Sequence, residues 1–210
     1  MNVRVLTVCG SIQPFSANRA AIDVAHSYMR SQRDVELDDY ADLVRIPPLN
    51  SALDDPGPVV TAWRKRIGTS DAVLIAAPEY AGALAGAIKN ALDWIVGSGE
   101  LYAKPVAVMS AGTTGGPFAR QMLIQTLTWQ GADVVAQIGI AAPRTKSDAH
   151  GRITDDATIA EIERLTAVLV DAPTLEAAAR LELVRTIVAT AGVDISRLAR
   201  PARVPDRGSV

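Results

Sequence analysis

The sequence predicts an α/β fold built on a doubly wound parallel sheet. Nearly unbroken apolar runs, typical of strands covered on both faces, occur at residues 3–9 (VRVLTVC), 71–78 (DAVLIAAP) and 106–111 (VAVMSA). Helical patterns separate these runs, and parallel strands need such crossovers. Polar turns rich in small residues follow several of the strands. These three observations favour an open sheet with helices on both faces.

The expected elements follow one another in alternation. They are strand 3–9, a helix from about residue 17, strand 34–40, loop 41–58, helix 59–67, strand 71–78, turn 79–83, helix 84–96, strand 106–111, turn 112–116, helix 117–130, strand 133–141, loop 143–151 and helix 155–171. Strand 34–40 alternates and is expected nearer a sheet edge, Trp63 is expected to anchor its helix, and Thr154 to cap the last one. Five strands in about 150 residues indicate the flavodoxin-like order rather than a larger Rossmann domain.

A further helix is expected after this unit. Apolar residues recur there at every fourth position: Leu175, Ala179, Leu183 and Ile187. The tail at 200–210 contains three arginines and two prolines, and we expect it to be poorly ordered unless a partner subunit holds it. The chain therefore divides into a flavodoxin-like domain at 1–172, an amphipathic helix at 173–199 and an Arg/Pro tail at 200–210.

The composition excludes several classes of protein. The 210 residues are 49% hydrophobic and 4% aromatic with a net charge of −2, which argues against a nucleic-acid surface. A single cysteine excludes an intrachain disulfide framework and fits a reducing compartment. No apolar run approaches the roughly 20 residues that a membrane span needs, and no room is left for a signal peptide before the first strand. We expect a soluble, cytoplasmic protein without a membrane partner.

The first strand and the turn after it carry the strongest functional signal. A strand, a small-residue turn and a helix start turn free backbone amides toward an anion. Ser16 suits the N-cap, the first helical turn holds no carboxylate, and its charged residue is Arg19. The sequence therefore predicts a phosphate group bound by the amides around 11–18. An ordinary surface βα turn is the alternative.

Other chemistry finds little support. The sequence holds neither a P-loop pattern nor a G-x-S-x-G nucleophile elbow. His26 and His150 lack partners at metal-ligand spacing and are expected at the surface, while Cys9 is expected to pack as a buried thiol. Asp38 and Asp39, which share the probable edge strand, are interpreted as solvated charges.

Three segments together resemble the NADPH-dependent FMN reductase family, which includes related azo, quinone and chromate reductases. GSIQPFSAN (10–18) is similar to the phosphate loop G-S-x-R-x-x-S-x-N. PEYAGALAGAIKNALDW (78–94) resembles P-E-Y-N-x-x-x-x-G-x-L-K-N-A-x-D-W, and SAGTTGGPFARQ (110–121) resembles the glycine-rich turn before a helix. The match covers roughly residues 1–170 and implies a flavodoxin-like fold.

The resemblance implies a flavin site made of three groups of residues. The FMN phosphate would lie among Ser11, Gln13, Ser16, Ala17 and Asn18, with the amides of 12–18 as donors. The edge of the isoalloxazine pocket would be formed, largely by backbone, by Pro78, Glu79, Tyr80, Ala81 and Gly82. The other side of the ring and the ribityl chain would be lined by Ser110, Gly112, Thr113 and Gly115. No acid, base, nucleophile or metal ligand is predicted.

Two positions depart from the family pattern. Gln13 replaces the arginine of the phosphate loop, which removes a charge-assisted contact worth about 1.5–3 kcal/mol unless Arg19 or another base compensates. Ala81 replaces an asparagine and removes a possible hydrogen bond to the flavin.

The resemblance also implies a homodimer or homotetramer, in which Lys89, Asp93 and Trp94 face a neighbouring subunit. Alternatively, Trp94 packs inside its own domain.

The resemblance thus implies an FMN-dependent oxidoreductase. Hydride would pass from NADPH, or from NADH, to the flavin N5, and electrons would then reach a small acceptor such as a quinone, an azo compound, a metal oxyanion or free flavin. The alternative is a flavodoxin-like protein without turnover, either a flavin-binding sensor or an interaction module.

Overall fold

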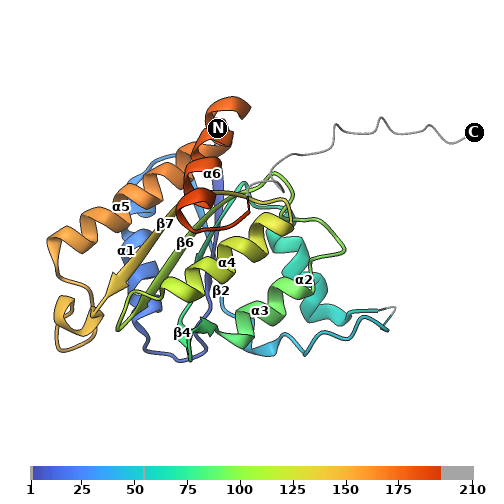
Figure 1. Cartoon of the computed structure of the whole chain (residues 1–210), viewed down its shortest axis with the longest axis horizontal. Coiled ribbons are helices and arrows are strands. Elements are labelled where there is room, and N and C mark those ends of the chain that lie inside the picture. The colour runs from blue at the N-terminus through green and yellow to red at the C-terminus, as the bar shows by residue number, and fades with distance from the viewer. Residues whose placement is uncertain (1, 54, 195–210) are drawn as a thin grey trace, which may run out of the picture.

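A five-stranded parallel sheet forms the centre of the molecule, in the order β2-β1-β3-β6-β7 (Figure 1). The computed structural model describes residues 2–53 and 55–194. The strands of the sheet are β1 (Val3–Cys9), β2 (Val35–Tyr40), β3 (Ala72–Ala76), β6 (Pro105–Gly112) and β7 (Asp133–Ala141). Every neighbouring pair is parallel. The predicted flavodoxin-like order is confirmed, with β2 at one edge.

Helices cover both faces of this sheet, as Figure 1 shows, with α1 and α5 on one side and α2, α3 and α4 on the other. Their bounds are α1 (Ala17–Ser31), α2 (Gly57–Gly68), α3 (Gly86–Asp93), α4 (Pro117–Trp129), α5 (Asp156–Asp171) and α6 (Ala177–Thr190). Single 3-10 turns lie at η1 (Leu43–Arg45), η2 (Pro143–Lys146) and η3 (Ala172–Thr174). Trp63 anchors α2 as predicted, fully buried, with its indole N–H donating to the Ala91 carbonyl at 2.9 Å. No helix within the described ranges is long and apolar enough to cross a membrane.

The segment predicted as a plain turn at 79–83 is a small hairpin. Its two strands are β4 (Glu79–Tyr80) and β5 (Ala83–Leu84), which pair antiparallel. The two residues between them have positive φ, 51° at Ala81 and 71° at Gly82. Positive φ at both central positions matches a type I′ turn, which fits the twist of short antiparallel strands.

Helix α6 packs on the domain itself, along the edge strand β7. Its fully buried residues are Val184 and Val188, so the buried face is rotated by one position from the predicted stripe. The reason is the ion pair between Arg180 Nε and the buried Asp133 Oδ2, at 2.9 Å, which fixes the helix on the start of β7. The predicted tail at 200–210 lies outside the described residues.

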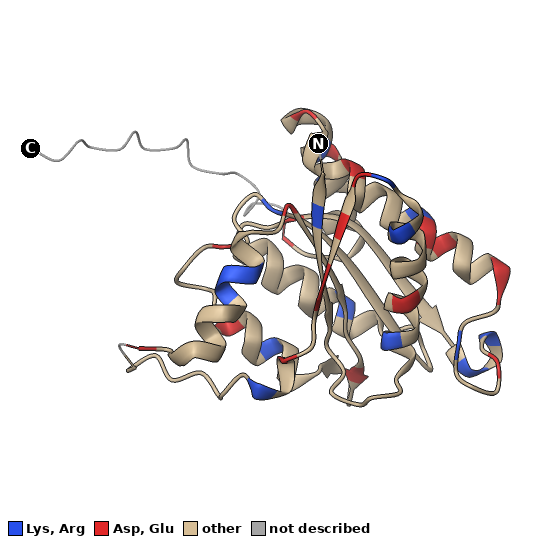
Figure 2. Ribbon diagram, turned by 180° about the vertical axis from the view of Figure 1, so that it is seen from behind, with Lys and Arg blue, Asp and Glu red and all other residues tan. Residues whose placement is uncertain are grey.

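One prediction about a helix cap and one about a charged side chain were wrong. Asp155, rather than Thr154, caps α5, because its carboxylate accepts from the Thr158 N–H at 2.9 Å. Asp38 is not a solvated charge: its side chain is 10% exposed and pairs with Arg4 (2.9 Å) and with Arg66. Figure 2 shows the mixed charges along this edge of the sheet.

His26 is buried rather than at the surface, and it belongs to a polar network between β1, α1 and β2. Its Nε2 lies 2.9 Å from Thr7 Oγ1, and the same hydroxyl donates to Asp39 Oδ1 at 3.0 Å. Because a hydroxyl has one proton and Asp39 accepts it, Nε2 acts as the donor. Burial lowers the pKa of His26, opposed by the nearby Asp39 carboxylate and reinforced by the Arg19 charge.

We expect Ala81→Asn to stabilise the protein by about 0.5–1 kcal/mol, because asparagine tolerates the left-handed conformation that alanine resists. Urea unfolding measures the change. The control is Ala52→Asn at an exposed loop position without positive φ, which should leave the free energy of unfolding nearly unchanged. An equal gain in both variants would contradict the turn assignment.

We also expect His26 to make the fold sensitive to mild acid. Below the ordinary histidine pKa of about 6.5 the unfolded chain takes up a proton that the folded chain resists. Stability is therefore lost as the pH falls from about 6.5 toward the lowered pKa, with a slope of at most about 1.4 kcal/mol per pH unit. His26→Gln keeps a donor for Thr7 and should flatten this part of the stability–pH profile.

The exposed His150 provides the matched control, since His150→Gln should keep the wild-type slope. The profiles are compared by denaturant unfolding between pH 7.5 and 5. A slope that falls equally in both variants would refute the role of the buried ring.

Candidate functional site

The turns at 10–18, 79–83 and 112–116 meet at the carboxyl edge of the sheet, the lower edge in Figure 1. A cleft of about 480 Å³ opens between them. Its lining consists of Ser11, Gln13, Phe15, Ser16, Ala17, Asn18, Pro78, Glu79, Tyr80, Ala111, Gly112, Thr113, Pro143, Arg144, Ser147 and Gly151. The convergence follows from the fold, because parallel strands all end at the same edge.

The start of α1 supplies open hydrogen-bond donors to this cleft. Ser16 is the N-cap, and its hydroxyl accepts from the Arg19 N–H at 3.1 Å. The backbone N–H groups of residues 15–18 donate to no other described residue. The first helical turn contains no acid. Unmatched amides at the positive end of a helix form a site for an anion.

Arg19 does not contribute its charge to this site. Its guanidinium holds both oxygens of Asp39 on β2, at 3.0 and 3.2 Å, and it lies within 3.9 Å of Asp23. Because Asp39 holds this guanidinium, Arg19 is not free to replace the arginine that is missing at position 13. The positive charge of Arg19 is neutralised by Asp39 on the edge strand β2.

The Asn18 side chain joins α1 to β6 by hydrogen bonds. Its side-chain Nδ2 donates to the carbonyl of Ala111 at 3.1 Å, and its Oδ1 accepts from the N–H of Ala111 at 2.9 Å. The side chain is buried. These bonds tie the first turn of α1 to the end of β6, so the Asn18 side chain is committed to Ala111.

Glu79 is committed to a second helix start. Its Oε2 accepts from the amides of Phe118 and Ala119, at 2.8 and 3.0 Å, which caps α4 where Gly116 provides no side chain. The β4–β5 hairpin is thereby fixed against α4. Its rim residue Tyr80 remains 54% exposed at the mouth of the cleft.

The turn at 112–116 is held from behind. Arg120 Nε donates to the Gly115 carbonyl at 3.2 Å, and its Nη1 donates to Gln137 Oε1 at 2.7 Å. Burial lowers the pKa of Arg120, while the Glu79 carboxylate opposes the shift. Ser110 lies beneath Gly116, buried, and its hydroxyl has no hydrogen-bond partner among the described residues.

The structure brings most of the predicted site residues together, with four exceptions. Ala81 and Gly82 lie at the hairpin tip, and Ser110 and Gly115 lie behind the third turn, so none of these four lines the cleft. Phe15, expected only through its amide, lines the cleft, and the lining residues that were not predicted are Ala111, Pro143, Arg144, Ser147 and Gly151. Pro143, Arg144, Ser147 and Gly151 come after β7 in the chain. Because β7 ends at the same edge of the sheet as the other strands, its following loop could have been predicted to border the cleft.

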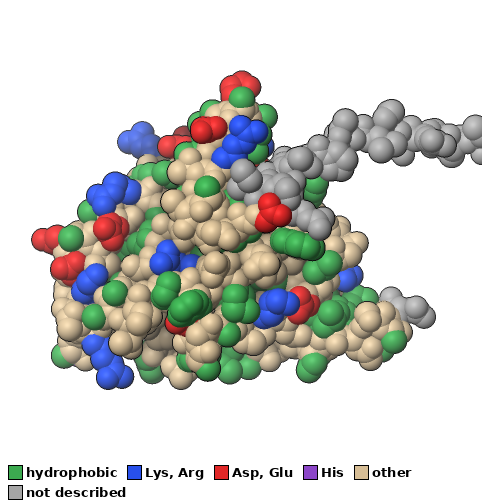
Figure 3. Space-filling model, in the orientation of Figure 1, with side chains coloured by type: hydrophobic (Ala, Val, Ile, Leu, Met, Phe, Trp, Pro, Cys, Tyr) green, Lys and Arg blue, Asp and Glu red, His purple; other side chains and the backbone are tan. Residues whose placement is uncertain are grey.

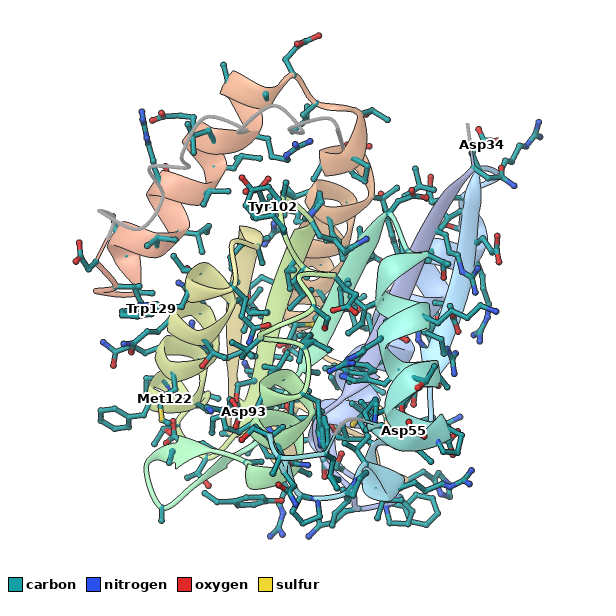
Figure 4. The ribbon with its side chains drawn as sticks, turned by 90° about the vertical axis from the view of Figure 1, so that its right-hand side faces the viewer. Asp34, Asp55, Asp93, Tyr102, Met122 and Trp129 are labelled. Carbon is teal, nitrogen blue, oxygen red and sulfur yellow. The ribbon has the colours of Figure 1, made fainter. Side chains whose placement is uncertain are left out.

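Trp94 packs inside its own domain, which settles one of the alternatives. It is 4% exposed, and its indole N–H donates to the Pro47 carbonyl at 2.7 Å. Lys89 and Asp93 pair with each other at 2.6 Å on the outer side of α3, where Figure 4 labels Asp93.

Comparison with known proteins identifies relatives of this chain. The family model described as NADPH-dependent FMN reductase matches residues 3–146. An NAD(P)H-dependent FMN reductase of Pseudomonas aeruginosa is 35% identical over 164 residues, which are 74% of this chain and 86% of that protein. An NADPH:quinone oxidoreductase of Arabidopsis thaliana is 32% identical over 180 residues, 80% of this chain and 88% of that protein.

Among solved structures, the flavoenzyme NAD(P)H:(acceptor) oxidoreductase FerB from Paracoccus denitrificans superposes with a TM-score of 0.67 and 27% identity. The superposition covers 80% of this chain and 96% of that structure. The family match spans the three turns that form the cleft and reaches into the loop after β7. The chain therefore belongs to the NADPH-dependent FMN reductase family, whose members use FMN and NAD(P)H.

Proposed function

We propose that the protein transfers electrons from NAD(P)H, through FMN held in the cleft, to small acceptors of the quinone class. The carrying observation is the start of α1, where the amides of residues 15–18 remain open in a turn without acid. The quinone class is supported by the name of the Arabidopsis thaliana relative. We further propose that the protein acts in the cytoplasm, since its single cysteine suits a reducing compartment.

The phosphate would be held at the first turn. Ser11, Ser16 and Gln13 provide neutral polar groups beside the open amides, and Asn18 keeps the turn in position through Ala111. A dianion fits this position because the helix start presents donors and no competing carboxylate. Amides alone carry only the partial charge of the helix end.

The flat ring would lie between the hairpin and the third turn. Pro78, Glu79 and Tyr80 border one side of the cleft, and Gly112 and Thr113 border the other. Small side chains leave the backbone of the third turn open to polar atoms of a ring. Ala81, Gly82, Ser110 and Gly115 would act from behind, by shaping the two turns.

The protein's part in the reaction is binding and orientation. When bound, FMN supplies the redox chemistry, since its ring accepts hydride from a reduced nicotinamide and passes electrons to an acceptor. The only carboxylate of the cleft lining belongs to Glu79, which caps α4. No side chain of the lining is therefore assigned as an acid or a base.

We also propose that the protein is a homo-oligomer that associates through the outer face of α4. Phe118, Met122 and Trp129 share this face and are 56%, 37% and 59% exposed. Figure 4 shows Met122 and Trp129 pointing away from the sheet, and Figure 3 shows apolar side chains gathered over this part of the surface. An apolar stripe on a helix is a suitable contact for a second copy.

The redox proposal is tested by adding FMN to the purified protein and following the flavin absorbance without oxygen. We expect the flavin to bind, to bleach on addition of NADPH or NADH, and to recover its colour when a benzoquinone is added. Bound flavin that neither nicotinamide reduces would instead indicate a sensor. Failure to bind FMN would indicate an interaction module.

The association proposal is tested with Met122→Glu, which places a charge in the centre of the stripe. We expect a lower mass in light scattering, because burying an unpaired carboxylate opposes association. Val96→Glu is the control, since Val96 is 62% exposed and follows α3 rather than lying on α4. A mass unchanged by the Met122 substitution would contradict an interface on this face.

A further inference from the structure

Arg144 is the only cation among the described residues that line the cleft. It lies in η2, shortly after β7. Its side chain is exposed, and no carboxylate or carbonyl of the described chain pairs with it. Figure 2 shows basic positions, in blue, in the loop that follows β7. An unpaired arginine facing a cleft is available to a ligand.

The loop that carries Arg144 has a defined conformation. The N–H of Ala142 donates to the carbonyls of Gly112 and Thr113, at 3.1 and 3.3 Å, which joins the loop to the third turn. Ser147 Oγ donates to the Pro143 carbonyl at 2.9 Å, and the Thr154 N–H donates to the Lys146 carbonyl at 2.9 Å. The backbone that carries the Arg144 side chain is therefore held in place by hydrogen bonds.

The other charges near the cleft are accounted for. Position 13 is the neutral Gln13, and Arg19 is held by Asp39. The Glu79 carboxylate is bound to the start of α4. The open amides at the start of α1 thus face a cleft with one uncommitted full charge, and that charge is positive.

We propose that Arg144 binds a phosphate group of a ligand in this cleft, whose phosphate loop carries the neutral Gln13 and no cationic side chain. This inference rests on the proposed function, which brings two phosphate-bearing ligands to the cleft, FMN and the nicotinamide dinucleotide. A guanidinium suits a phosphate because its planar donors can bind two oxygens at once. Arg144 and the start of α1 line the same cleft.

The test compares Arg144→Gln with the wild-type protein by titration of FMN and of riboflavin, which lacks the phosphate. Flavin fluorescence quenching gives both dissociation constants. If Arg144 binds the FMN phosphate, its replacement should weaken FMN about tenfold and leave riboflavin unchanged, because a charge-assisted contact is lost. The salt dependence of FMN binding should fall in the variant as well.

If Arg144 instead binds a phosphate of the dinucleotide, FMN affinity stays constant and the KM for NADPH rises while kcat is kept. Either result supports the proposal and identifies the source of the phosphate. Lys146→Gln is the matched control: it removes the same charge from the same 3-10 turn, but Lys146 does not line the cleft and its charge acts on Asp155. Adding Gln13→Arg to Arg144→Gln should restore FMN affinity if both positions serve the flavin phosphate.

Unchanged binding of both phosphate ligands in Arg144→Gln, or an equal loss in Lys146→Gln, would overturn the inference and leave the proposed function intact. A wild-type protein that binds neither FMN nor riboflavin would overturn both.

Discussion

The paired hydrogen bonds between the Asn18 side chain and the backbone of Ala111 hold the site together. They join residues 93 positions apart in the chain, and the Asn18 side chain is shielded from solvent. A buried amide with both its oxygen and its nitrogen bonded gives a unique arrangement, because any displacement would leave a polar atom without a partner. The first turn is therefore oriented by β6, and the strand-end turns act as one unit.

A similar principle governs the other helix starts at this edge. Gly116 gives α4 no side-chain cap, and Glu79 provides one from the hairpin. The start of α1 receives only the cap from its own Ser16, and its further donors stay open. Two helices thus begin at the same edge with different partners: one is closed by the protein, and the other is left for a ligand.

The sheet order and the position of the cleft were predictable from the sequence, because apolar runs and strand-end turns are local signals. Contacts between distant residues were not. The pairing of Arg19 with Asp39 joins α1 to β2, which no local pattern indicates. His26 was wrongly predicted at the surface because Thr7, distant in the sequence, provides a buried partner. Arg144 was missed because a polar loop gives no local pattern that indicates which way its side chains face.

The two edges of the sheet have a consequence for how the protein can assemble. At β2, Asp38 is locked between Arg4 and Arg66, and at the other edge α6 lies along β7. Charged clusters and covering helices are both means by which proteins prevent foreign strands from adding to a sheet. Growth by strand addition is thus disfavoured at both edges of the sheet, so an association of copies of this chain is expected to use helical faces rather than strand edges.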